Sequence, residues 1–71
     1  MKVYRYYTRL RPPMPGAIPL NGVTNTATFD WKQSFNGVGC WGWAEYDHEL
    51  TQKEIDDYEL APSVNNPLVY D

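Results

Sequence analysis

The stretch that decides the fold runs CWGWAEYDHELTQKEI over residues 40–55 and joins a strand pattern to a helix start. Its first half alternates large side chains with small ones, which is typical of a strand with two different faces. One face takes Trp41, Trp43 and Glu45. The other face takes Cys40, Gly42, Ala44 and Tyr46. We therefore predict a strand over residues 40–46.

The second half of this stretch predicts a helix that begins at Thr51. Thr51 and Glu54 form a capping box, in which each side chain satisfies a backbone N–H group of the first helical turn. Leu50 and Ile55 flank the cap as a hydrophobic staple. We predict a short helix of about two turns that ends at Tyr58 or Leu60.

A second strand is predicted at the start of the chain, over residues 2–10. Aromatic residues are frequent there, and the side chains alternate with a period of two. One face, expected to be buried, takes Tyr4, Tyr6, Thr8 and Leu10. The opposite face, expected to be cationic, takes Arg5, Tyr7 and Arg9.

Turn signals divide the rest of the chain. The proline-rich residues 11–19 predict an ordered loop, because proline cannot donate to a sheet, and Asn21-Gly22 predicts a turn. Residues 23–29 are Thr-rich and fit a strand. Residues 30–39 fit a loop or a second hairpin turn. Residues 61–71 are expected to form an irregular tail, in which residues 68–70 could form an edge strand. The sum is a single α+β domain over residues 1–71, with three or four mostly antiparallel strands and one short helix packed across them.

The size of the chain favours self-association. A domain of 71 residues buries only about 60% of its unfolded surface, so its core is thin. The chain nevertheless carries three Trp, six Tyr and two Phe, and aromatic residues are enriched at the centres of interfaces. We expect these rings to lie at a binding surface or between subunits, and we expect a homo-oligomer.

Charge and hydropathy narrow the range of partners. Residues 1–20 hold four basic side chains and no acid, whereas residues 45–60 hold seven acids and one lysine. The net charge of −3 argues against general binding of duplex DNA. No apolar stretch approaches the roughly 20 residues of a membrane span, so we expect no membrane partner. The lone Cys40, without a signal-like apolar start, is typical of a cytoplasmic protein.

No catalytic, cofactor or metal site is predicted. Cys40 and His48 are the available nucleophile and base, but the strand pattern places Cys40 beside Gly42 and Ala44, where a small buried thiol is the ordinary explanation. Asp47, His48 and Glu49 are adjacent in sequence and do not converge on one ion. We therefore predict a protein that binds and does not catalyse.

The candidate ligand-binding residues are cationic and aromatic. Arginine side chains bind phosphates through two hydrogen bonds, and aromatic faces stack on bases, so the combination suits an anionic, nucleotide-like ligand. The candidates are Arg5, Tyr7, Arg9, Arg11, Trp41 and Trp43. In the alternative reading the aromatic rings are core and the arginines form salt bridges with the acidic helix of the same or a neighbouring chain.

Residues 4–19, YRYYTRLRPPMPGAIP, together with Trp41-Gly42, Tyr46-Asp47 and the helix, resemble small uncharacterised proteins of phages and mobile elements of gut Firmicutes. The resemblance covers most of residues 1–60 and carries over no site residue. It implies a phage-type accessory protein that inhibits host immune defence, acts in the host cytoplasm and sequesters an anionic nucleotide-like ligand in an oligomer.

Two other functions remain open at this stage. The first is a protein-binding inhibitor whose acidic helix, with Asp56, Asp57 and Glu59, mimics nucleic acid for a host defence protein. The second is an accessory module of a larger phage assembly.

Overall fold

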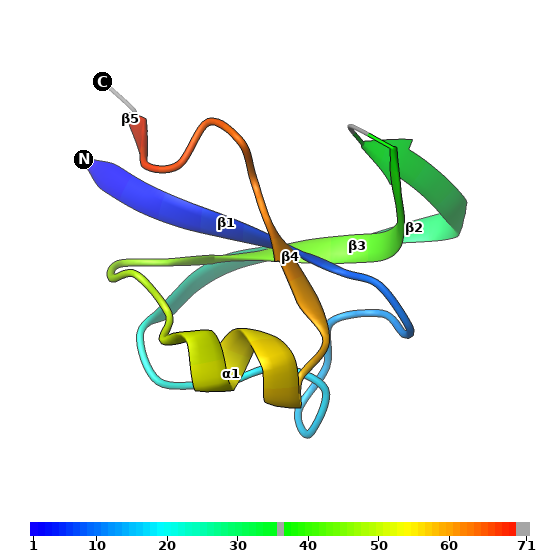
Figure 1. The fold of residues 1–71 in the computed structure, drawn as a ribbon, viewed down its shortest axis with the longest axis horizontal. Coiled ribbons are helices and arrows are strands. Elements are labelled where there is room, and N and C mark those ends of the chain that lie inside the picture. The colour runs from blue at the N-terminus through cyan, green and yellow to red at the C-terminus, as the bar shows by residue number, and fades with distance from the viewer. Residues whose placement is uncertain (36, 70–71) are drawn as a thin grey trace.

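The computed structural model describes residues 1–35 and 37–69, and within them the chain forms a sheet of five strands and one helix (Figure 1). The elements are β1 (Lys2–Thr8), β2 (Val23–Phe35), β3 (Val38–Tyr46), α1 (Gln52–Asp57), β4 (Leu60–Pro62) and β5 (Leu68–Val69). Two predicted features, the turn residue Asn36 and the strand residue Tyr70, lie outside the described residues.

The sheet is antiparallel throughout. Its order is β2-β3-β1-β4, and β5 pairs with the first residues of β1. In the β1–β3 register, Tyr6 lies opposite Ala44 and Tyr7 opposite Trp43. The predicted α+β fold, with a small antiparallel sheet and one short helix, is confirmed.

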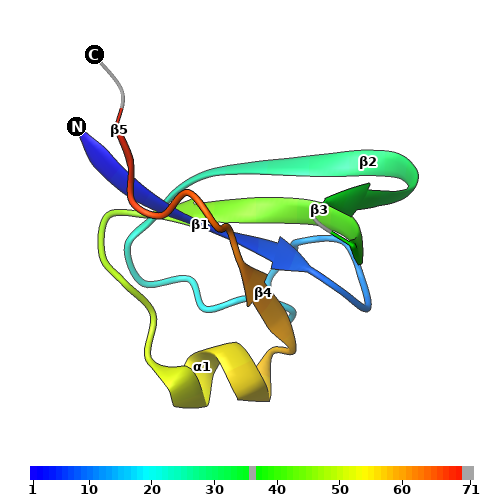
Figure 2. The ribbon, with the colours of Figure 1, turned by 45° about the horizontal axis from the view of Figure 1, so that its top comes forward.

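Both faces predicted for β3 are observed, and one side of the sheet carries the core. Tyr6, Ala44 and Tyr46 belong to one buried cluster. The helix α1 and the 9–22 connection lie on the same side of the sheet (Figure 2). The core is completed by Ile18, Leu50 and Leu60. Gly42 allows the connection to approach, because a Cβ atom there would lie 2.6 Å from Pro13 Cδ.

The helix begins where the capping box predicted. The Thr51 hydroxyl accepts from the Glu54 N–H group at 3.2 Å, and a Glu54 carboxylate oxygen accepts from the Thr51 N–H group at 3.0 Å. The helix ends at Asp57, next to the predicted end, and Glu59 follows with a positive φ of 53°. In the part of the chain described, no helix is long and apolar enough to cross a membrane.

Three local predictions need correction. Residues 30–35 continue β2 and residues 38–39 begin β3, because these segments pair with each other across an irregular register that local sequence does not reveal. The tail was expected to be irregular from residue 61 but contributes Ala61 and Pro62 to β4, whereas the strand considered possible near its end is present as β5. Leu10, expected on the buried face, is 58% exposed because β1 already ends at Thr8.

Candidate functional site

The sheet face opposite the core carries an ion pair that involves a predicted ligand-binding residue. Arg5 and Glu45 face each other in the β1–β3 register, and the Arg5 Nε and Nη2 atoms donate to Glu45 Oε2 at 2.9 and 2.7 Å. The Arg5 guanidinium also lies over the Trp43 ring, 4.2 Å from its centroid. The Glu45 side chain is only 4% exposed, so Arg5 compensates a buried charge.

The other predicted site residues divide into two groups. Tyr7 is buried opposite Trp43, and Trp41 and Trp43 are half-buried on β3. Arg9 and Arg11 follow the end of β1 and are exposed. The structure thus brings Arg5, Tyr7 and Trp43 together on one sheet face and places the other two arginines beyond it.

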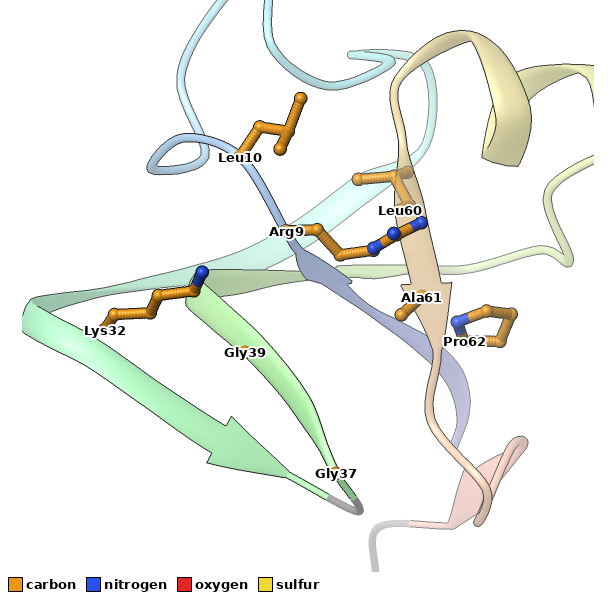
Figure 3. Close-up of a pocket in the computed structure, with 8 residues that line it drawn as sticks. All are labelled: Arg9, Leu10, Lys32, Gly37, Gly39, Leu60, Ala61 and Pro62. Atoms are coloured by element: carbon orange, nitrogen blue, oxygen red, sulfur yellow. The ribbon is translucent and has the colours of Figure 1, made fainter.

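Arg9 lies at a cavity of about 480 Å³ that is bounded by three strands and the segment that follows β1 (Figure 3). Arg9 and Leu10 follow β1, Lys32 belongs to β2, Gly37 and Gly39 belong to the β2–β3 hairpin, and β4 forms the remaining wall. The lining residues are Arg9, Leu10, Lys32, Gly37, Gly39, Leu60, Ala61 and Pro62.

The irregular part of β2 places Lys32 at this cavity. Between the Thr28–Gly42 and Gln33–Cys40 pairs, β2 contains more residues than β3, so Lys32 lies in a bulge. Bulges bend a strand and change the direction in which a side chain points. A Cβ atom on Gly39 would lie 2.5 Å from Lys32 Cε, so the glycine leaves the space that the lysine side chain occupies.

The cavity combines positive charge with an apolar wall. Arg9 and Lys32 are its charged lining residues, and no acidic residue lines it in the described part of the chain. Among the described residues, neither cation forms an ion pair. Leu10, Leu60, Ala61 and Pro62 supply apolar surface. Sequence reasoning identified Arg9 but missed Lys32, because residues 30–39 were expected to be a loop or turn.

The thiol and the imidazole lie in different surroundings. Cys40 is buried, and burial raises the pKa of its thiol. The His48 Nδ1 atom lies 2.9 Å from an Asp47 carboxylate oxygen, and the ring packs edge-on against Tyr46. Residues 1–35 and 37–69 contain no group of three or more His, Cys, Asp or Glu side chains that could hold a metal ion.

The acidic residues of α1 interact mainly with their own helix. Lys53 Nζ donates to an Asp57 carboxylate oxygen at 2.6 Å, and Gln52 donates to Asp56 at 2.9 Å. Asp56, Asp57 and Glu59 are exposed. The helix therefore presents negative charge on the molecular surface.

Comparison with known proteins identifies a family. The model of the family described as defence against restriction A C-terminal matches residues 1–65. No curated protein and no solved structure matches the chain. The match agrees with the expected setting of a phage accessory protein that acts against host defence. The chain belongs to the defence against restriction A C-terminal family.

Proposed function

We propose that this protein helps a phage evade restriction as a non-catalytic binding module in the host cytoplasm, by capturing an anionic nucleotide-like ligand. The observation that supports this function is the cavity in which Arg9 and Lys32 stand beside an apolar wall. Both cations lack an ion-pair partner among the described residues, so a ligand phosphate can supply the missing negative charge.

The shape and chemistry of the cavity suit such a ligand. A volume of about 480 Å³ falls within the range of small-molecule sites, roughly 300 to 1,000 Å³. Arg9 can bind two phosphate oxygens through its planar guanidinium, and Lys32 adds a point charge. Leu10, Leu60 and Pro62 can contact the apolar face of a base or sugar.

In this proposal the six candidate residues of the sequence take different roles, and Trp41 has none in binding because it does not line the cavity. Arg9 binds the ligand, together with Lys32. Arg5 pairs with Glu45 and lies over the Trp43 ring, and thereby joins β1 to β3, and Tyr7 lies opposite Trp43 in the register. Arg11 does not line the cavity and serves as a matched control, because it is an exposed arginine two residues away.

Calorimetry tests the proposal directly. The probes are inorganic phosphate, nucleoside monophosphates, cyclic dinucleotides and a short single-stranded oligonucleotide, which separate a free phosphate from a nucleotide or a strand. We expect one class to bind and added salt to weaken the binding. Arg9→Ala and Lys32→Ala should each weaken it by about tenfold or more, because a hydrogen bond to a charged group contributes about 1.5 to 3 kcal/mol.

The control and a cellular assay decide the outcome. Arg11→Ala removes the same charge and should leave affinity within about twofold, since the effects of surface substitutions are usually small. In cells that restrict incoming phage, the wild-type protein should protect the phage and the Arg9→Ala, Lys32→Ala double variant should not. Absence of binding to every probe, or an equal loss with Arg11→Ala, would rule out the cavity as the site.

A further inference from the structure

A second cavity, of about 410 Å³, lies between α1, β1 and β4. Tyr6 and Leu50 at this cavity are buried, Tyr4 and Ile55 are half-buried, and Pro62 is exposed. We call this surface the helix groove. Its lining residues are Tyr4, Tyr6, Glu49, Leu50, Thr51, Gln52, Ile55, Pro62 and Asn66.

The helix groove is negatively charged. Glu49 is exposed and is the charged residue among those described that line the groove. Burial raises the pKa of the Tyr6 hydroxyl, and the negative charges of Glu49 and Glu54 raise it further. A groove with apolar walls and one carboxylate at its rim favours a bulky apolar side chain next to a cation.

This chain carries a segment with that chemistry. Leu10 is 58% exposed and stands between two exposed arginines, Arg9 and Arg11, in the turn that follows β1. Leu10 lines the cavity of Arg9 and Lys32 and does not line the helix groove of its own molecule. The turn and the start of α1 lie at different ends of the molecule (Figure 1).

We propose that the Arg9-Leu10-Arg11 turn of one molecule docks into the helix groove of a second copy, with Leu10 in the groove and Arg11 beside Glu49. Leu10 gains burial against Tyr4 and Ile55, and Arg11 meets an opposite charge. The contact joins two different surfaces, so the association is head-to-tail, and every molecule offers both surfaces.

A charge-exchange experiment tests this contact. Sedimentation of the wild-type protein over a range of concentrations should show dimers or larger species at micromolar concentration. Glu49→Lys and Arg11→Glu should each weaken association by about tenfold or more, because each places like charges in contact. The protein that carries both changes restores an opposite pair between neighbouring molecules and should associate again.

Two further variants make the result specific. Leu10→Ser should weaken association without any change of charge. Asp30→Lys makes the same change of charge as Glu49→Lys at an exposed residue outside the groove, and it should associate like wild type. Amide NMR spectra establish that each variant is folded.

Three results would overturn the contact: a wild-type monomer up to millimolar concentration, association unaffected by Glu49→Lys, or a double-exchange protein no better than the single variants. The Glu49 and Arg11 variants leave the lining of the ligand cavity unchanged, because neither residue lines it. Nucleotide binding should therefore persist in the Glu49→Lys monomer, which separates a failure of this contact from a failure of the proposed function.

Discussion

At the scale of single residues, two tyrosine hydroxyls connect the core to the backbone. Tyr46 donates to the Pro19 carbonyl at 2.6 Å, and the Tyr6 hydroxyl accepts from the Leu50 N–H group at 3.0 Å. The first bond fixes the loop before β2 and the second fixes the approach to α1. Each hydroxyl thus links a strand to an irregular segment distant in sequence.

Tyr46→Phe should lower the free energy of unfolding by about 1 to 3 kcal/mol, because it leaves the Pro19 carbonyl without its donor in the core. Tyr58→Phe removes the same atom from a side chain that is 38% exposed and should change stability by less than about 0.5 kcal/mol. Urea denaturation of the three proteins gives the comparison. Equal stability of wild type and Tyr46→Phe would contradict the assigned bond.

The same tyrosines predict alkaline unfolding. Burial raises the pKa of both Tyr6 and Tyr46 above the ordinary value of 10.0, so the folded state holds protons that the unfolded state releases. Stability that is present below pH 10 should therefore fall as the pH rises above it. Melting temperatures measured from pH 8 to 11 should decline most steeply near the top of that range, and less steeply in Tyr46→Phe.

At the scale of elements, α1 depends on its cap more than on its length. It contains six residues, and helices this short are unstable unless caps and packing support them. The capping box supplies hydrogen bonds at the N-terminus, and Leu50 and Ile55 join the helix to the core. The acids near its end add negative charge where the helix dipole disfavours it.

Thr51→Ala should cost about 0.5 to 2 kcal/mol of stability, because the Glu54 N–H group loses its acceptor. Thr51→Ser keeps the hydroxyl and should stay close to wild type. Chemical denaturation measures both, and the loss should follow the hydroxyl and not the methyl group. A Thr51→Ser variant as unstable as Thr51→Ala would point to packing instead of capping.

Elements whose signals lie in neighbouring residues could be predicted from the sequence. Features that depend on pairing between strands distant in sequence could not. The alternation in β1 and β3 and the cap of α1 can be read from neighbouring residues. The bulge of β2 depends on its pairing with β3, so local sequence could not place Lys32 at the same cavity as Arg9. The partner of Arg5 could not be predicted from local sequence either, because Glu45 lies 40 residues away and is brought opposite Arg5 by the strand register.

At the scale of the whole molecule, the side chain of one asparagine adds to the strand pairing that joins the two ends of the chain. Asn66 Oδ1 accepts from the Arg5 N–H group at 2.8 Å, and Asn66 Nδ2 donates to the Arg5 carbonyl at 2.9 Å. The side chain thus pairs with β1 as a strand would, in the segment between β4 and β5. Asn66 thereby also positions the backbone of Arg5, whose side chain donates to Glu45.

Asn66→Ala should destabilise the fold by about 1 to 3 kcal/mol, because the part-buried Arg5 N–H group loses its acceptor and the Arg5 carbonyl is left with the bond from the Ser63 N–H group. Asn65→Ala is the matched control, since the Asn65 side chain is exposed and, among the described residues, Asn65 bonds through its backbone N–H group to the Ser63 hydroxyl. Hydrogen exchange should show faster opening at Arg5 in Asn66→Ala alone. If Arg5 stays protected, the bonds to Asn66 do not hold β1, and the pairing of β4 and β5 would have to secure it instead.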